Sequence, residues 1–321
     1  MQRRDTVKNV LRVFLALVIV LGIFNIGILI YKENIEKVEY SSVQLDNFIE
    51  VNGYKINYKT YGDANSTDLP TIFLHGFNAA ANNEWNHIAP YLDASKFYVF
   101  IDLPGLGLSE RLTDDEKPTM DWQTNMLQKI FAELVPDKQV NLVTVSYSTT
   151  QGMLYLKEHA DKINKFVAIS PLFFNQGGGS FSALGNVPLG IGSGFTFLAM
   201  GGGFIGNFLY ALGCEQANDF CPTQADIDTR NYNASIIGTT KTFEQYNQYF
   251  EEQELEDILR VNSDKITVIV GENDGYVTDI SEQLNNLGVN QIYLIKNSGH
   301  VPHLSKSAQV AQLINNIYSN I

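Results

Sequence analysis

Short apolar runs alternate with helical stretches along most of this chain, which limits the folds that it can adopt. Six apolar runs are typical of buried strands, at residues 71–74, 97–101, 140–145, 166–169, 266–270 and 292–295. Helical patterns fall between or after them, near residues 83–91, 120–134, 147–159, 280–287 and 307–318. Such alternation is typical of parallel strands joined by crossover helices. The sequence therefore predicts an α/β fold with a mostly parallel central sheet and helices on both faces.

A β-hairpin is expected before these strands. Residues 43–51 and 54–61 have strand-like patterns and flank the pair Asn52-Gly53, which favours a tight hairpin turn. We expect this hairpin to add antiparallel edge strands to the sheet.

The alternation stops at residues 172–264, which we interpret as an insertion into a core formed by residues 43–171 and 265–321. No Asp, Glu, Lys or Arg occurs in residues 172–214, and glycine is dense there. A second transmembrane helix near residues 187–212 would put the strands on either side of it in different compartments. A plain buried insertion without a ligand role is another alternative. We expect an apolar lid or cap over a cleft.

The N-terminus has the pattern of a membrane anchor. Residues 1–12 are basic, and residues 13–31 carry no charge over a length close to the roughly 20 residues that cross a hydrocarbon core. A cleaved signal peptide is the alternative, but its apolar region is only about 7 to 15 residues long. The linker 32–42 is acidic, so the positive-inside rule predicts a single-pass protein of the cell membrane. Its N-terminus would be cytoplasmic and its body extracytoplasmic.

Charge and cysteine content exclude several classes of protein. The chain has 22 Lys and Arg against 35 Asp and Glu, a formal net charge of −13, so it would repel nucleic acid. Its two cysteines, Cys214 and Cys221, exclude a disulfide-rich scaffold and a CxxC metal site. They are a possible disulfide outside the cytoplasm, and two free buried thiols are the alternative. No paired histidines at helical spacing accompany an acid, so we expect neither a metal nor a cofactor.

Ser146 occupies a position suited to a nucleophile. It follows an apolar strand pattern and directly precedes a helical one. A serine at such a sharp turn is exposed above the sheet, and the next backbone N–H, that of Tyr147, can stabilise an oxyanion. The usual pattern is Gly-x-Ser-x-Gly, but here Thr144 and Ser148 replace the glycines. A simple helix cap is therefore the alternative interpretation.

Two further motifs stand after earlier strand patterns: His-Gly-Phe at residues 75–77 and Asp-Leu-Pro-Gly-Leu-Gly-Leu-Ser at residues 102–109. The N–H of Phe77 is a candidate for the second oxyanion donor. With the serine turn, a late acid and a final histidine, these motifs resemble the α/β-hydrolase fold superfamily from about residue 43 to the C-terminus. The resemblance implies that fold with a lid in the insertion, a Ser-Asp-His triad, and a structural role for residues 102–109.

The nucleophile needs a base to accept its proton. Of the five histidines, His300 lies in a loop after the last strand pattern, where the resembled superfamily has its base. His303 is a nearby rival. The other three histidines fit structural or surface roles: His75, His87 and His159.

The base in turn needs an orienting acid. Asp274 follows the strand pattern at residues 266–270, so its carboxylate is expected to reach the cleft. Glu272 and Asp279 are rivals. The order Ser146, Asp274, His300 then matches the order of nucleophile, acid and histidine in the superfamily.

These features together predict a membrane-anchored serine hydrolase that forms an acyl-enzyme. We expect an ester substrate first, then a thioester or an amide, and the charge-free insertion favours an apolar, lipid-like acyl group. The alternative is a non-catalytic surface module that keeps the fold as a binding domain, because fold alone does not establish function. The two replaced glycines favour this alternative.

Overall fold

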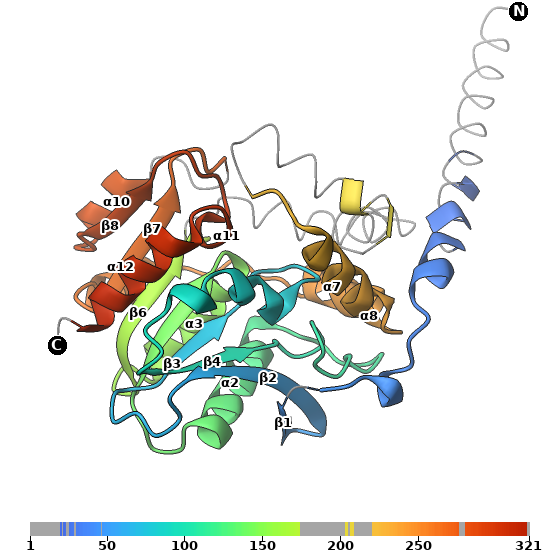
Figure 1. The fold of residues 1–321 in the computed structure, drawn as a ribbon, viewed down its shortest axis with the longest axis horizontal. Coiled ribbons are helices and arrows are strands. Elements are labelled where there is room, and N and C mark those ends of the chain that lie inside the picture. Colours follow the sequence, from blue (N-terminus) through green and yellow to red (C-terminus); the bar gives the residue numbers. More distant parts are fainter. Residues whose placement is uncertain are drawn as a thin grey trace, which may run out of the picture.

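The computed structural model describes residues 20, 22–23, 26–28, 30–45, 47–173, 203–204, 206–208, 220–275 and 280–319. The described residues form an eight-stranded sheet with the order β1-β2-β4-β3-β5-β6-β7-β8 (Figure 1). Strand β2 pairs antiparallel with β1 and β4, and the other neighbouring strands pair in parallel. The predicted α/β fold with a mostly parallel sheet is therefore confirmed.

The strands lie close to the expected apolar runs. Their bounds are β1 (Asn47–Val51), β2 (Tyr54–Gly62), β3 (Thr71–Leu74), β4 (Phe97–Ile101), β5 (Val140–Val145), β6 (Ile163–Ile169), β7 (Ile266–Gly271) and β8 (Gln291–Ile295). The first strand begins at Asn47 and not at residue 43, and β6 begins three residues before the expected start. Asn52 and Gly53 both have positive φ, 53° and 84°, as the expected hairpin turn requires.

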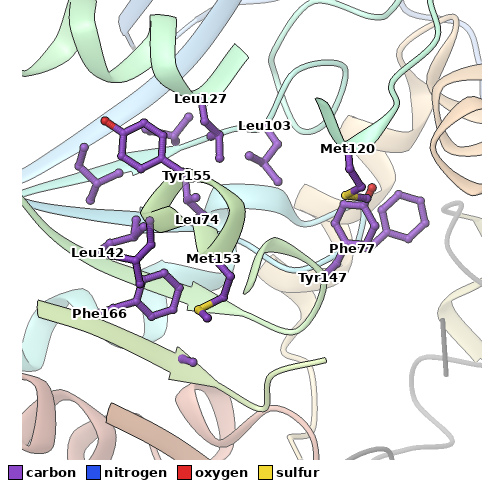
Figure 2. Packing of buried hydrophobic residues seen from close by; sticks show 14 of the residues in the cluster. Leu74, Phe77, Leu103, Met120, Leu127, Leu142, Tyr147, Met153, Tyr155 and Phe166 are labelled. Atoms are coloured by element: carbon purple, nitrogen blue, oxygen red, sulfur yellow. The ribbon is translucent and has the colours of Figure 1, made fainter. Parts of the chain in front are cut away.

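Helices cover both faces of the sheet. One face carries α2 (Met120–Leu134), α3 (Tyr147–Glu158) and α10 (Ile280–Asn286), and the other carries two 3₁₀ helices and α12 (Ser307–Ser319). Neighbouring residues of a strand point to opposite faces, so Leu142 and Val143 of β5 lie in different cores. Figure 2 shows the first core, where Leu142 lies near Phe166 of β6 and Met153 of α3.

The helix expected near residues 83–91 has a different form. It consists of two 3₁₀ helices, η2 (Ala81–His87) and η3 (Ala89–Tyr91). Pro90 lies in the first turn of η3. Because proline has no N–H to donate and its ring clashes with the preceding turn, a continuous α-helix cannot run through this position.

The described part of the predicted insertion is helical. It contains α7 (Gln224–Ser235), α8 (Thr239–Gln248) and α9 (Glu256–Val261), and the chain returns to the sheet at β7. A short helix after β8, α11 (Pro302–Ser305), precedes α12. Most of the glycine-rich stretch lies outside the described residues. The domain boundaries, including the limits of the insertion at residues 172 and 264, stay predictions.

The predicted membrane anchor, residues 13–31, also lies largely outside the described residues. In the parts of the chain that the structure describes, no helix is both long enough and apolar enough to cross a membrane. Residues 30–35 are helical and lead to η1 (Tyr40–Ser42). Between them, Val38 forms a parallel bridge with Ile236, at the end of α7.

Candidate active site

Ser146 lies at the sharp turn between β5 and α3. Its backbone has φ 51° and ψ −115°, which is unusual for a residue with a Cβ atom. The N–H of Ser146 donates to the Ile169 carbonyl at 2.9 Å, so the end of the neighbouring strand β6 supports the turn. Strained backbone of this kind clusters at functional sites, where the surrounding structure has to maintain it.

The two residues that replace the usual glycines are completely buried beside this turn. The Ser148 hydroxyl donates to the Leu74 carbonyl at 2.9 Å and accepts from the Val145 N–H at 3.1 Å. The hydroxyl of Thr144 lies 3.1 Å from that of Thr149. Both hydroxyls therefore have partners, which makes their burial tolerable.

Gly152 of α3 provides the space that the Thr144 methyl group needs. A Cβ atom at Gly152 would lie 2.9 Å from Thr144 Cγ2 and 3.0 Å from the Phe166 ring. The glycine that lets helix and strand approach is therefore at position 152, one helical turn after position 148, where the usual pattern has it. The sequence analysis did not single out Gly152, because the usual pattern extends only two residues past the serine.

The structure brings Ser146, His300 and Asp274 together in one hydrogen-bonded chain. His300 Nε2 lies 3.0 Å from Ser146 Oγ. On the other side of the ring, His300 Nδ1 lies 3.0 Å from each carboxylate oxygen of Asp274, which is buried. Because an ionised carboxylate only accepts, Nδ1 carries the proton and Nε2 is left to accept from the serine hydroxyl.

A close contact between two loops positions the histidine and the acid. Asp274 follows β7, and His300 follows β8. The Asn273 N–H donates to the Ser298 carbonyl at 2.8 Å, which joins the loops. A Cβ atom at Gly271 would lie 2.0 Å from the Gly299 carbonyl oxygen, so this approach requires glycine at position 271.

The rival residues have other surroundings. His303, in α11, is fully buried, and its ring centroid lies 5.0 Å from that of Trp85. Glu272 is exposed and accepts from the Asn297 N–H at 3.1 Å. Asp279 lies outside the described residues. Of the acids that the structure describes, Asp274 is the one hydrogen-bonded to His300.

The two predicted oxyanion residues lie on adjacent segments. Phe77 follows β3, Tyr147 begins α3, and their ring centroids are 5.2 Å apart (Figure 2). The Tyr147 hydroxyl donates to Gln123 of α2 at 2.9 Å, and burial raises the pKa of Tyr147 well above its usual value. The role of the two backbone N–H groups stays a prediction.

Glu84 supports the loop that carries Phe77, and the sequence analysis missed it. Its carboxylate accepts from the Gly76 N–H at 3.0 Å and from the Asn78 side-chain amide at 2.8 Å. His303 Nε2 lies 3.7 Å from the same carboxylate, so this acid lies between the loop of Phe77 and the segment that follows His300. Burial alone would raise the pKa of Glu84, but the interactions with His303 and the Gly76 N–H outweigh it and lower that pKa.

Asp102 has a structural environment. It is fully buried and accepts from the Asn57 side chain and the Asn82 N–H, both at 2.8 Å. It also accepts from the Leu108 N–H at 3.0 Å. Burial raises the pKa of Asp102 above its usual value. These contacts hold the turn at residues 102–109 against the sheet, as the resemblance implied.

The remaining predicted site residues are the cysteines. Cys221 is disulfide-bonded, and Cys214 lies outside the described residues, so the pairing of the two stays a prediction. Within the described ranges, no group of three or more His, Cys, Asp and Glu side chains is arranged to hold a metal ion.

The chain is similar to known proteins along much of its length. Residues 70–195 match the α/β-hydrolase fold family. A pimeloyl-[acyl-carrier protein] methyl ester esterase from Legionella pneumophila (strain Paris) is 32% identical over 76 residues, 24% of this chain and only 27% of that esterase.

Two solved structures share the fold at low identity. A meta-cleavage product hydrolase from Pseudomonas fluorescens IP01 has a TM-score of 0.65 and 14% identity, over 86% of this chain and 98% of that one. A membrane phospholipase A described as a bacterial virulence factor has a TM-score of 0.67 and 17% identity, over 100% of both chains. With its sheet order and its serine turn, the chain has the α/β-hydrolase fold, and residues 70–195 match the family of that name.

Proposed function

We propose that this protein is a membrane-anchored serine hydrolase that cleaves an ester of an apolar acyl group. The observation that carries the proposal is the chain of contacts from Ser146 Oγ through His300 to Asp274, with both ring nitrogens at 3.0 Å from their partners. A serine with this partner chain on a strained turn is poised for nucleophilic attack.

The reaction follows from the positions of the protons. Ser146 Oγ attacks the ester carbonyl carbon while its proton passes to His300 Nε2. Asp274 keeps the other ring nitrogen protonated and stabilises the imidazolium that forms. The backbone N–H groups of Phe77 and Tyr147 would stabilise the oxyanion. His300 then gives its proton to the leaving alcohol, and water releases the acid from the acyl-enzyme by the same steps.

The side chains beside the proposed oxyanion site favour an apolar acyl group. The ring of Phe77 lies 4.8 Å from that of Phe243, and the ring of Tyr147 lies 5.5 Å from that of Phe250. Tyr246 joins the group at 6.0 Å from both Phe77 and Tyr147. All five rings are buried, so they make the surroundings of the proposed oxyanion site apolar. Together with the charge-free residues 172–214, these surroundings favour hydrocarbon over a charged group.

Membrane anchoring is the second part of the proposal. Residues 13–31 carry no charge and follow a basic segment, so we infer a single-pass protein of the cell membrane with an extracytoplasmic catalytic domain. The membrane phospholipase A that shares this fold is one protein whose name joins a membrane with a lipid substrate, and it motivates a test of both here.

The test of the chemistry uses the full chain in detergent. The purified protein and Ser146→Ala are compared on a series of short-chain and long-chain acyl esters and with a fluorophosphonate probe. Loss of a triad nucleophile is expected to lower turnover by about 10⁶ and to remove labelling. If the folded wild type neither labels nor hydrolyses any ester, the non-catalytic binding module is the better account.

A further inference from the structure

Three segments distant in sequence meet at the described part of the insertion. The first is residues 30–40, which comprise the end of the proposed anchor and most of the linker. The second is the short helical stretch at residues 203–208, of which the structure describes all but residue 205. The third is the pair of helices α7 and α8. In Figure 1, α7 and α8 lie on the side of the molecule nearest the N-terminal helical segment.

Glu36 fastens the first segment to the insertion. Its carboxylate accepts from the Gly238 N–H at 3.1 Å and from the Thr240 N–H at 2.6 Å, at the start of α8, and it also contacts the Thr240 hydroxyl. An acidic side chain is favourable there because the first N–H groups of a helix lack partners within the helix. The N–H groups of Lys37 and Val38 add bonds to the Ser235 carbonyl at 2.7 Å and 2.9 Å.

The second segment is fastened to α7. Arg230 is buried and donates to the Gly206 carbonyl at 2.8 Å. Asn231 accepts from the Gly203 N–H at 2.8 Å and from the Asn207 side chain at 2.9 Å. A Cβ atom at Gly203 would lie 2.6 Å from the Tyr31 hydroxyl, so this segment also touches the first one.

Two phenylalanines of the second segment face solvent next to these contacts. Phe204 is 83% exposed and Phe208 is 55% exposed, and their rings stack at 6.5 Å. Large exposed aromatic side chains on adjacent turns leave apolar area in water. Four apolar residues of the N-terminal helix are also exposed, namely Val20, Ile23, Ile26 and Ile30, whereas Ile28 is half-buried.

We propose that Phe204 and Phe208 insert into the surface of a lipid bilayer, held there by the Glu36 contact between the linker and α8. The proposal rests on the membrane anchor of the proposed function and adds a second point of contact to it. A bilayer is the expected partner of this surface because the surface lies close to the proposed anchor. The linker that follows the anchor is hydrogen-bonded directly to α8 and to the end of α7. Because the chain is acidic overall, the contact would depend on apolar burial and not on attraction to anionic lipid.

The test measures how close chosen positions of the protein lie to the bilayer surface, and it does not depend on ester hydrolysis. The full chain is reconstituted in vesicles of phosphatidylcholine brominated near the carbonyl end of one acyl chain, which quenches tryptophan close to the bilayer surface. Single tryptophans are introduced by Phe208→Trp, by Ile30→Trp at the outer end of the proposed anchor, and by Tyr293→Trp in β8. Tyr293 is 38% exposed and β8 lies on the side of the molecule away from the N-terminal helical segment (Figure 1). The quenching of the wild type, from Trp85 and Trp122, is subtracted.

We expect tryptophan at positions 30 and 208 to be quenched to within about twofold of each other, and tryptophan at position 293 to stay unquenched. Quenching at position 30 alone would overturn the proposed surface while leaving the anchor in place. No quenching at position 30 would overturn the anchor, and the surface proposal with it. Equal quenching at all three positions would exclude an oriented contact.

The role of Glu36 is tested in the Phe208→Trp background. Glu36→Ala should lower quenching at position 208 toward the value at position 293, and the matched variant Glu39→Ala, an exposed acid in the same segment, should leave it unchanged. Unchanged quenching in both variants would contradict the Glu36 contact. Hydrolysis of a water-soluble short-chain ester should stay within about twofold in these variants, so a failure of the serine chemistry is detected separately.

Discussion

Two regions of the molecule are held in place by different forces. The first is the pair of strands β5 and β7, which precede Ser146 and Asp274, and the second is the group of helices in the insertion. Every residue of β5 and β7 is buried, and their side chains are apolar except for Asn141, Thr144 and Thr267. In α7, by contrast, only Arg230, Asn233 and Ala234 are buried. The core is fixed by apolar burial along whole strands, whereas α7 is fixed by a few polar contacts. Changes in the first region should therefore be costly, and changes in the second should be small and separable.

Asp274→Asn should produce the largest effect in this comparison. The amide can donate to His300 Nδ1 and so favours the wrong ring tautomer, and comparable changes cost about 10⁴ in kcat with the geometry intact. Steady-state kinetics on a soluble ester measure the loss. Glu272→Gln is the matched control, because Glu272 is exposed and bonds only to a backbone N–H in the described part of the chain. An equal loss in both variants would contradict the assignment of the acid.

Glu84→Gln tests the buried support of the Phe77 loop. Glutamine cannot accept with both terminal atoms, so one of the donors from Gly76 and Asn78 loses its partner, at a cost of about 1–3 kcal/mol in the free energy of unfolding. Denaturant titration measures this cost, and Glu50→Gln on the exposed edge strand should change little.

The difference in stability between the wild type and Glu84→Gln should depend on pH. The pKa of Glu84 in the folded protein lies below its usual value of 4.5. Its contribution to stability is therefore present above that usual value and is lost as the pH falls through the lower folded pKa. The stability difference between the wild type and Glu84→Gln should therefore shrink as the pH falls below 4.5. A difference that grows as the pH falls would mean that the folded pKa is raised.

Gly152→Ala tests whether Gly152 provides the space that the two missing glycines of the serine turn would otherwise provide. Its Cβ atom would meet Thr144 Cγ2 and the Phe166 ring, and overpacking of this kind costs about 1–3 kcal/mol. Thr144→Ser removes the methyl group but keeps the hydroxyl, so the double variant should recover part of the loss. A double-mutant cycle by thermal or chemical denaturation measures the coupling. Additive effects would show that Thr144 and Gly152 do not share this space.

Asp226→Ala should have the smallest effect. Asp226 completes the capping box of α7 with Thr223 and accepts from His87 Nε2 at 2.7 Å. Loss of such a cap costs about 1 kcal/mol, with the triad geometry unchanged. The matched variant Asp228→Ala lies on the same helix, and its carboxylate accepts only from Gln224 on the surface in the described structure. A loss of ester hydrolysis as large as that of Asp274→Asn would remove the distinction between the two regions.

The core could be predicted because its signals are local and repeated. The strands consist mostly of apolar residues, and the serine, acid and histidine each follow a parallel strand, so the topology alone brings their loops to one edge of the sheet. Pro90, in the first turn of η3, prevents one continuous helix over residues 83–91. The position of this proline in the sequence is enough to predict the break.

The supporting contacts could not be predicted in the same way. Glu84 has the sequence appearance of an exposed acid in a polar helical stretch, and its burial depends on the loop at Gly76 and on His303, more than 200 residues later. The contact of Glu36 with α8 likewise joins positions more than 200 residues apart. Such pairs leave no periodic pattern in the sequence.

The most direct test of the central claim is to locate a covalent adduct. The full-length protein is treated with a fluorophosphonate, digested and mapped by mass spectrometry. The Ser146–His300–Asp274 geometry predicts one adduct, on the peptide that contains Ser146, and none after Ser146→Ala or on the unfolded wild type. An adduct on another residue, or none on the folded wild type, would contradict the claim that Ser146 is an activated nucleophile.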